Sequence, residues 1–307
     1  MKVGFIGLGA MGLPMAKRVI GAGYPILTMC HRRRGPVDAL ATLGATVLET
    51  PADIAGQADV IVTILPADAE LEEAALGARG LVEAFGAGKI LVDMTTATAQ
   101  TLLRVEKALA ERGGRVLDAP VSGGTVAAEN GTLTIMVGGE TELLERVRPL
   151  LETMGKNIVH VGGVGQGKLV KIVNQVMAAI HLLALGEAFA LGVRCGADPK
   201  VLYDVIKASS GYSKMMDLRL PGFLFEGTFQ PGFRLDLMKK DVNLAVDSAQ
   251  ALGVPLMFGS LAAQVFSAAS TAGRGSEDFA AAADFLAGLA GARLNCGASG
   301  IRGMTCA

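Results

Sequence analysis

The feature that most constrains the fold is a glycine-rich segment close to the start of the chain. It follows a short apolar run, 3–6, and opens a helical pattern that continues to Ala22. The first glycine of such a segment permits a tight turn after a strand, the second lets a ligand approach the backbone, and the third lets helix and strand pack closely. Strand, turn and helix in this order predict a dinucleotide site, in which amides at the helix start bind the diphosphate. The predicted cofactor residues of this segment are Gly7, Leu8, Gly9, Ala10, Met11 and Gly12.

Short apolar runs then alternate with helical segments through the first half of the chain. Uninterrupted apolar strands separated by helices are typical of a parallel sheet covered on both faces. Two later runs, 135–137 and 158–160, flank a helical segment and could extend the same sheet. The further strands predicted for the parallel sheet lie at 26–29, 60–63, 90–93 and 115–117.

The pattern changes after a glycine-rich stretch at 161–167, beyond which helical periodicity dominates to about residue 291. Residues 166–194 are predicted to form a single helix of roughly 40 Å. We therefore predict an α/β protein with three parts. They are an N-terminal Rossmann-type doubly wound domain at 1–163, an all-α domain at 164–291 joined to it by the long helix, and a flexible tail at 292–307.

Composition excludes several classes of protein. Hydrophobic residues make up 51% of the chain and charged residues 19%, which argues against disorder. The 28 basic and 29 acidic residues nearly cancel, so we expect neither nucleic acid nor an anionic membrane surface as a partner. The cysteines lack the spacing of metal ligands, and we expect neither a metal site nor a disulfide framework. They are Cys30, Cys195, Cys296 and Cys306.

Neither a leader peptide nor a membrane span is expected. The chain runs from Met1-Lys2 directly into a predicted strand, without the segments of a signal peptide. Its most apolar long stretch, 177–193, is interrupted by His181 and Glu187 and falls short of a span. We interpret this stretch as a buried helix in a cytoplasmic protein.

The end of the second predicted strand bears on the choice of cofactor. A carboxylate there would bind the adenosine ribose of NAD, but this chain has His31, Arg32, Arg33 and Arg34. Guanidinium groups suit a 2′-phosphate through charge-assisted bonds, so NADP is favoured over NAD, and His31 is placed near the adenosine. The alternative is that these arginines belong to a solvated loop, and at least one of them is expected to do so.

Three further segments carry polar residues suited to chemistry. Residues 118–124 follow a strand and contain a glycine pair that can expose amides to an anion. Residues 165–175 place Lys171 early on the long helix, and residues 232–241 begin a later helix. Together with residues 5–16, these segments resemble the β-hydroxyacid dehydrogenase family. The resemblance covers essentially residues 1–291, with the four motifs in the order of the family.

This resemblance implies a role for each matching residue. Lys171 matches the catalytic lysine of the family, and members of the family form dimers or tetramers. Some relatives have asparagine where this chain has Gln175, so the reach of that amide differs. The resemblance assigns Ser122, Gly123, Gly124, Asn174 and Gln175 to the substrate, and Leu65, Pro66, Thr96 and Lys240 to the cofactor.

The chemistry required agrees with these roles. Reducing an aldehyde needs a hydride donor and an acid, and oxidising the alcohol needs the same group as a base. A lysine that is partly desolvated can have its pKa brought toward neutrality. We therefore expect reversible reduction of a small carboxylate-bearing semialdehyde to its 3-hydroxy acid, with Lys171 as general acid and base.

Simpler interpretations remain open for several residues. Lys171 could be a surface lysine whose stem covers apolar atoms, whereas Lys168, one turn earlier, is expected to face solvent. Asn174 could be a helix-packing amide, and Lys240 could pair with Asp236 on the surface of its helix.

Two other functions compete with this prediction. One is an imine reductase of related architecture, and the other is a non-catalytic scaffold that binds the cofactor. The resemblance implies that such relatives lose the lysine, so Lys171 and the intact 122–124 loop count against both.

Overall fold

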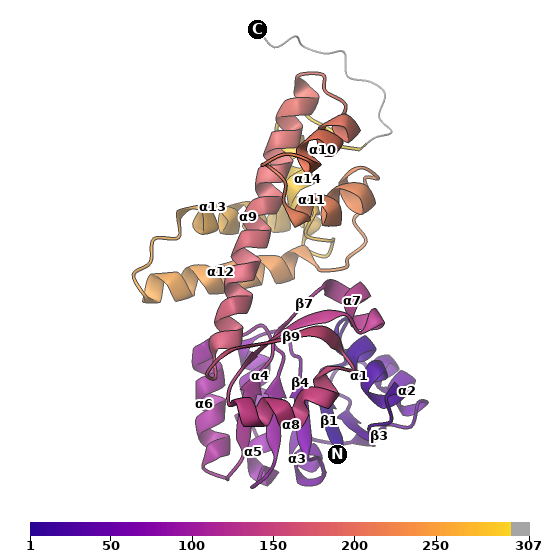
Figure 1. Cartoon of the computed structure of the whole chain (residues 1–307), viewed down its shortest axis with the longest axis vertical. Helices are drawn as coiled ribbons and strands as arrows, with labels where there is room; N and C mark the ends of the chain where they lie inside the picture. Colours follow the sequence, from indigo (N-terminus) through magenta and orange to yellow (C-terminus); the bar gives the residue numbers. More distant parts are fainter. Residues whose placement is uncertain (296–307) are drawn as a thin grey trace. The chain divides into compact units, whose positions relative to one another are not determined.

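The computed structural model describes residues 1–295 of the 307-residue chain (Figure 1). The chain divides into two compact units, Met1–Lys171 and Ile172–Ala307. This division falls inside helix α9 (Gln166–Arg194), whereas the boundary predicted from the sequence lies before the helix begins. The predicted tail at 292–307 lies outside the described residues from 296 onward.

The first unit is built on a sheet in which β1 to β6 run parallel. The order across the sheet is β3-β2-β1-β4-β5-β6-β8-β7, and β9 pairs with β8. The Rossmann-type fold predicted from the sequence is confirmed. The strands are β1 (Val3–Ile6), β2 (Ile26–Met29), β3 (Thr46–Leu48), β4 (Val60–Thr63), β5 (Ile90–Asp93), β6 (Arg115–Asp118), β7 (Val121–Ser122), β8 (Leu133–Gly138) and β9 (Gly155–Gly162).

The sheet departs from a purely parallel arrangement at one side. Strand β8 is antiparallel to both β6 and β7, and β9 returns parallel to β8 after helix α8 (Thr141–Leu151). The sequence indicates that β8 and β9 join the sheet, but apolar runs carry no information about strand direction.

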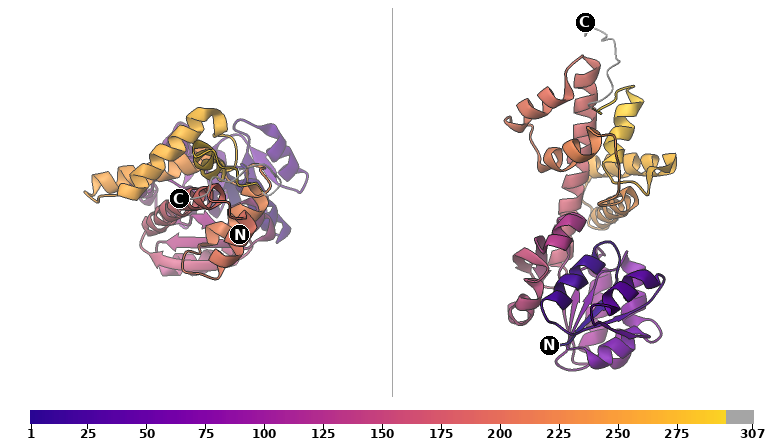
Figure 2. Two further views of the ribbon diagram at one scale, coloured as in Figure 1. Left: turned by 90° about the horizontal axis from the view of Figure 1, so that it is seen from above. Right: turned by 90° about the vertical axis from the view of Figure 1, so that its right-hand side faces the viewer.

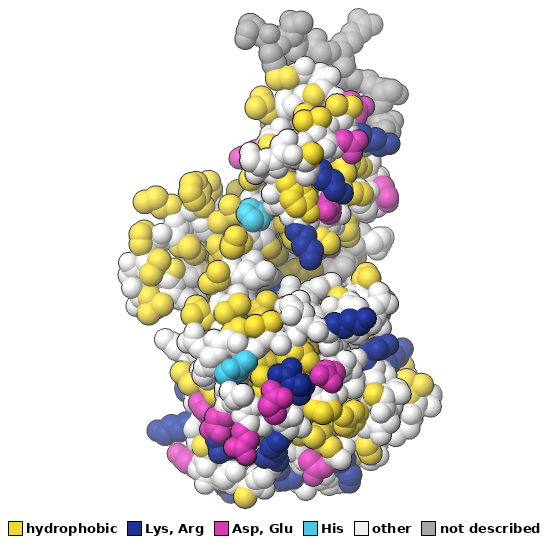
Figure 3. Space-filling view, viewed as in Figure 1, with side chains coloured by type: hydrophobic (Ala, Val, Ile, Leu, Met, Phe, Trp, Pro, Cys, Tyr) yellow, Lys and Arg dark blue, Asp and Glu magenta, His cyan; other side chains and the backbone are white. Residues whose placement is uncertain are grey.

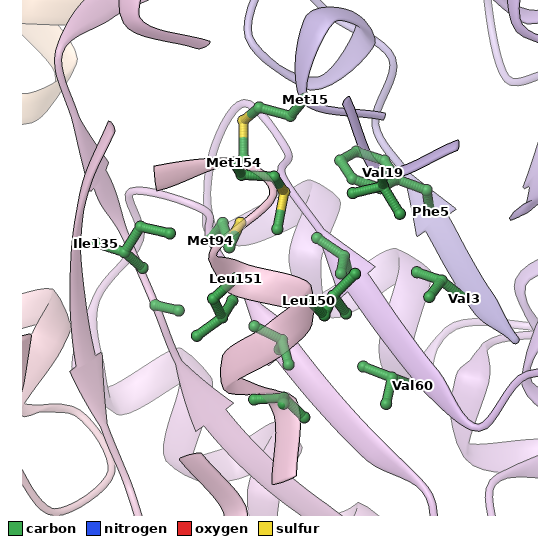
Figure 4. Close-up of a cluster of buried hydrophobic side chains, with 14 of the residues drawn as sticks. Val3, Phe5, Met15, Val19, Val60, Met94, Ile135, Leu150, Leu151 and Met154 are labelled. Atoms are coloured by element: carbon green, nitrogen blue, oxygen red, sulfur yellow. The ribbon is translucent and has the colours of Figure 1, made fainter. Parts of the chain in front are cut away.

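Helices cover both faces of this sheet, because successive strand residues point to opposite sides. Val3 and Phe5 of β1 enter the core on one face with side chains of α1 (Gly12–Gly21) and α8, as Figure 4 shows. Ile61 of β4 enters the core on the other face with side chains of α3 (Pro51–Gln57), α4 (Asp68–Leu76) and α6 (Ala99–Ala110). The remaining helices of the unit are α2 (Arg34–Ala41), α5 (Leu81–Ala84) and α7 (Gly124–Asn130).

The second unit is helical, as predicted, and its other helices pack against part of α9, which keeps Val173, Met177 and Leu191 exposed (Figure 2). Leu182 and Phe189 of α9 are buried in its core with Met216 and Phe266. After α9 come α10 (Pro199–Lys207), α11 (Lys214–Arg219), the π-helical η1 (Leu220–Leu224), α12 (Leu235–Ala251), α13 (Met257–Ala269), the π-helical η2 (Ser270–Arg274) and α14 (Ala281–Leu289).

Helix α9 has the bounds predicted from the sequence. By length and composition it could cross a membrane, contrary to the expectation that its apolar stretch is too short. The core helix of a soluble protein meets the same criterion, and Ala179, Leu182 and Phe189 of α9 are buried inside the second unit. His181 is half-buried, and Glu187 is exposed.

One cysteine expectation is wrong. Cys195, which follows α9, is disulfide-bonded, whereas Cys30 is a free thiol. Bond formation depends on the distance between two cysteines in the folded chain, and their spacing in the sequence does not reveal that distance.

Candidate functional site

Several predicted cofactor residues lie at one edge of the sheet in the first unit. The glycine-rich loop follows β1, Leu65 and Pro66 follow β4, and Thr96 follows β5. Strands β1 and β4 are neighbours, and the strand order reverses direction between them. In doubly wound sheets ligands bind at the carboxyl ends of the strands beside such a reversal. Two of these loops are joined directly, because the Leu65 amide donates a hydrogen bond to Thr95 Oγ1 at 3.0 Å.

The three motif glycines have different surroundings. A Cβ atom at Gly12 would lie 1.8 Å from the Gly7 carbonyl oxygen, and one at Gly7 would lie 2.1 Å from the Ile64 carbonyl oxygen. A Cβ atom at Gly9 would meet nothing within 4 Å. Gly7 and Gly12 therefore allow the loop to pack, whereas Gly9 leaves space open beside the backbone.

The start of α1 fits a diphosphate. Its N-cap residue, Met11, makes no side-chain capping bond, and no acidic residue lies in its first turn. The amides of an uncapped first turn can bind an anion, and the helix dipole favours negative charge there. A cavity of about 390 Å³ beside this turn is lined by Gly9, Ala10, Leu13, Pro14, Lys17 and Glu129.

The arginines after β2 separate into two groups. Arg34 begins α2 and forms a solvent-exposed ion pair with Asp38 at 3.3 Å. The sequence predicts such a surface role for at least one of the three arginines, and Arg34 is that arginine. His31, Arg32 and Arg33 are exposed between β2 and α2. They occupy the position at which an adenosine ribose or its 2′-phosphate would be bound in this fold.

The loop predicted to bind the substrate carboxylate joins β7 to α7. Ser122 ends β7, and the next two residues have positive φ angles, +137° at Gly123 and +70° at Gly124. Side chains disfavour such angles, so glycine is required for this loop shape. Its role toward a substrate remains a prediction.

Lys171 is buried, with 7% of its surface exposed. The alternative that it is an ordinary surface lysine is therefore wrong. It lies in the first turns of α9, three residues after Lys168.

The expectation for Lys168 is also wrong, because its side chain is fully buried instead of facing solvent. Its Nζ lies 2.5 Å from Asp93 Oδ2, 2.5 Å from the Thr95 carbonyl oxygen and 3.1 Å from the Asp93 carbonyl oxygen. The sequence shows that α9 begins here, but it does not show that this turn docks on the end of β5. That docking supplies the partners of the ammonium.

Asp118, at the end of β6, holds the same turn by its backbone. Its two carboxylate oxygens accept hydrogen bonds from the Gly165 amide at 2.9 Å and the Lys168 amide at 2.8 Å. Burial raises the pKa of Asp118, and these two hydrogen bonds act in the opposite direction. The close approach requires glycine at Gly167, since a Cβ atom there would lie 2.7 Å from Asp118 Oδ2.

Asp93 and Asp118 are functional candidates that the sequence reasoning missed. Thr63, Asp93 and Asp118 are paired in register at the ends of β4, β5 and β6. The available signal was a polar residue that closes each apolar strand, because parallel strands bring their carboxyl ends to one edge.

In the second unit, the substrate candidates of α9 are linked to α12. Asn174 donates to Gln175 Oε1 at 3.1 Å, and the buried Gln175 donates to Asp241 Oδ2 at 2.7 Å. Lys240 Nζ lies 2.9 Å from Asp241 Oδ1. The Asp241 carboxylate, also missed from the sequence, thus joins Gln175 and Lys240.

The suggested pairing of Lys240 with Asp236 is wrong. Asp236 contacts Lys239 at 3.2 Å and accepts a hydrogen bond from Ser270 at 2.6 Å.

Two family models match the chain. One, described as the NAD binding domain of 6-phosphogluconate dehydrogenase, matches residues 2–162. The other, described as NAD-binding of NADP-dependent 3-hydroxyisobutyrate dehydrogenase, matches residues 165–286. Both parts of the chain are therefore similar to parts of NAD(P)-dependent dehydrogenases.

Individual proteins are similar over nearly the whole chain. The 2-(hydroxymethyl)glutarate dehydrogenase of Eubacterium barkeri is 39% identical over 92% of this chain and 93% of its own length. The 2-hydroxy-3-oxopropionate reductase of Escherichia coli is 37% identical over 96% of this chain and 100% of its own. The structure of 3-hydroxyisobutyrate dehydrogenase from Mycobacterium tuberculosis with L-serine has a TM-score of 0.86 and 31% identity, covering 93% of this chain and 98% of that one.

Proposed function

Because the chain belongs to the β-hydroxyacid dehydrogenase family of NAD(P)-dependent oxidoreductases, we propose that it interconverts a small carboxylate-bearing semialdehyde and the corresponding 3-hydroxy acid. The observation that carries the proposal is a buried lysine, Lys171, on a helix whose first turn is bonded to the ends of β5 and β6. The predicted cofactor loops lie at that same edge of the sheet.

The dinucleotide is held by the first unit in this proposal. The open space beside Gly9 and the uncapped start of α1 receive the diphosphate. Leu65 and Pro66 lie beside the cofactor, and Thr96 lies near its nicotinamide end. When bound, the nicotinamide supplies or accepts the hydride. The protein contributes position and a proton.

Lys171 handles that proton. It protonates the carbonyl oxygen of the semialdehyde during reduction and removes the same proton from the hydroxyl during oxidation. Ser122, Gly123 and Gly124 anchor the substrate carboxylate through polar groups of their loop, which fixes the distance from the carboxylate to the reacting carbon.

The amide pair of α9 supports the substrate. Gln175 accepts a hydrogen bond from Asn174 and is itself held by Asp241, so we expect Gln175 to orient the Asn174 amide. Lys240 contacts the cofactor in this proposal, with Asp241 fixing its side chain.

We favour NADP over NAD. Arg32 and Arg33 are exposed after β2, a position from which guanidinium groups can bind a 2′-phosphate in bidentate fashion. His31 is placed against the adenosine.

We further propose a soluble, cytoplasmic homo-dimer or homo-tetramer that associates through its helical unit. Large apolar side chains gather on the exposed surface of α13 and of the loop that joins α12 to it (Figure 3). Contiguous apolar surface of this kind marks interaction sites. The residues are Leu252, Val254, Met257, Phe258 and Leu261.

The proposal is tested with a panel of small semialdehydes and 3-hydroxy acids, assayed in both directions with NADPH, NADP, NADH and NAD. Lys171→Ala should lower kcat about 10²- to 10⁴-fold, the usual effect of losing a general acid–base group, while cofactor affinity persists. Lys107→Ala, at an exposed lysine of α6, is the matched control and should keep wild-type turnover.

Two results would contradict the proposal. Tight cofactor binding without turnover of any substrate in the panel would favour a non-catalytic scaffold. Wild-type turnover by Lys171→Ala would contradict the proposed role of Lys171 in proton transfer, but it would not contradict the enzyme class.

A further inference from the structure

A fully buried ion pair joins the start of α9 to the end of β5. The exposed fraction is 0% for the side chains of both Lys168 and Asp93. The ammonium has three N–H donors and three acceptors within reach, namely Asp93 Oδ2, the Asp93 carbonyl and the Thr95 carbonyl. Its hydrogen-bonding capacity is therefore fully used inside the protein.

The carboxylate of Asp93 extends this connection to the neighbouring strand. Its Oδ1 accepts hydrogen bonds from Thr63 Oγ1 at 2.7 Å and from the Thr95 amide at 3.2 Å. Thr95 Oγ1 in turn accepts from the Leu65 amide at 3.0 Å. One chain of bonds thus links the loops after β4 and β5 to Lys168.

We propose that Lys168 is a positioning residue, which sets Lys171 in fixed relation to the loop that carries Thr95 and Thr96. This inference rests on the proposed function, because it assumes that Lys171 transfers the proton and that this loop faces the nicotinamide. Lys168 does not itself touch substrate or cofactor in the proposal.

The geometry of the helix supports this assignment. Residues three apart on a helix lie one above the other, with roughly 5–6 Å between their Cβ atoms. A movement of the first turn of α9 at Lys168 would therefore be passed to Lys171. The backbone amide of Lys168 is held as well, by Asp118, so both its main chain and its side chain are anchored to strand ends.

A purely structural role would not require these charges. Removing two ions from water is costly, and well-packed apolar residues of similar volume often stabilise a protein as well or better. The pair does fix a position, because hydrogen bonds are directional and an ammonium bonded to three fixed oxygens can occupy only one place. Directional bonding is required where a proton and a hydride must reach adjacent atoms, because a displacement of 1 Å can reduce a rate about 10²-fold.

The test separates position from stability by removing the pair in two ways. Lys168→Met leaves Asp93 as an unpaired buried charge, whereas Lys168→Met with Asp93→Asn removes both charges. Lys89→Met is the matched control, since Lys89 donates to the Ala58 carbonyl at 2.7 Å just before β5 begins, at the opposite edge of the same sheet. Lys168→Gln, which keeps an N–H donor, replaces the double variant should that variant not fold.

Each folded variant is assayed for kcat, KM, NADPH affinity, the primary deuterium isotope effect on hydride transfer, and the midpoint of thermal unfolding. The double variant should regain stability relative to Lys168→Met but keep a kcat about 10- to 100-fold below wild type. NADPH affinity should stay within about threefold, and the isotope effect should increase because the chemical step becomes slower. Lys89→Met should lower the midpoint only.

The inference is overturned if kcat of the double variant returns to within about threefold of wild type as stability returns, since that result indicates a structural role alone. It is also overturned if Lys89→Met lowers kcat as much as the double variant does. Wild-type and Lys171→Ala enzymes assayed alongside report separately on the proposed function. If the wild type is active and Lys171→Ala is inactive, the proposed function stands even where the inference about Lys168 fails. If the wild type is inactive on every substrate, both are overturned.

Discussion

Alanine substitutions at two glycines of the same loop should have opposite consequences. At Gly12, the new Cβ atom would lie 1.8 Å from the Gly7 carbonyl oxygen, a separation that real Cβ atoms do not show. The strand–turn–helix junction must then open by about 1 Å in a packed region, and such overpacking costs typically about 1–3 kcal/mol. At Gly9, nothing lies within 4 Å of the new atom, so the fold should accept it with a change below about 1 kcal/mol.

These free energies translate into measurable shifts. For a unit of this size, 1 kcal/mol moves the midpoint of thermal unfolding by about 2–4 °C, so Gly12→Ala should lower it by roughly 2–12 °C. Gly9→Ala should leave the midpoint close to wild type but weaken NADPH binding. Loss of one hydrogen bond to a charged diphosphate costs about 1.5–3 kcal/mol, which is roughly a 10- to 150-fold rise in Kd.

The assay is differential scanning calorimetry without cofactor, followed by titration of NADPH at a temperature where both variants are folded. The separate roles of the two glycines are refuted if Gly9→Ala destabilises the protein as much as Gly12→Ala does. They are refuted equally if Gly9→Ala binds NADPH as tightly as wild type, because the open space beside Gly9 would then have no part in binding.

Three further outcomes are expected. Arg32→Ala should weaken the binding of NADPH about 10- to 150-fold and the binding of NADH much less. The control Arg34→Ala, at the arginine paired with Asp38, should change neither affinity. Equal losses of affinity for both cofactors would contradict the NADP preference. Phe258→Glu, which charges the exposed face of α13, should shift the oligomer toward monomer in light scattering, and the control Leu43→Glu on the first unit should not; an unchanged mass for Phe258→Glu would exclude this face. Hydrogen bonds from Tyr203 and Tyr212, together with Lys207, lower the pKa of Asp217 from 3.8 to about 2, so its stabilisation is present above pH 3.8 and lost as pH falls toward 2. Asp217→Asn should therefore flatten the acid-induced drop in urea midpoint over that interval, and an unaltered slope would show that this carboxylate does not contribute.

Much of the first unit could be predicted because the signals are local. The apolar runs that became β1, β4 and β5 and the glycine-rich loop each constrain a few neighbouring residues, and their order along the chain implies a doubly wound sheet. The family resemblance, which depends on four such local segments, is confirmed, and with it the enzyme class.

The partners of buried polar groups could not be predicted in this way. Lys168 meets Asp93 across 75 residues of sequence, and Gln175 meets Asp241 across 66. A helical pattern shows which residues share a face. The pattern around a lysine beside an apolar stripe is the same whether its ammonium reaches water or a buried carboxylate.

The sequence by itself determined the backbone plan of this protein, a dinucleotide fold followed by a helical unit, because strand period, helix period and glycine placement act over short distances. Only the tertiary structure decided which charges are buried and what they hold, since that depends on which strand ends lie side by side and where α9 docks on them. The environment of Lys168 and the anchoring of the turn before Lys171 are properties of that docking, and the residues that create it are separated along the chain.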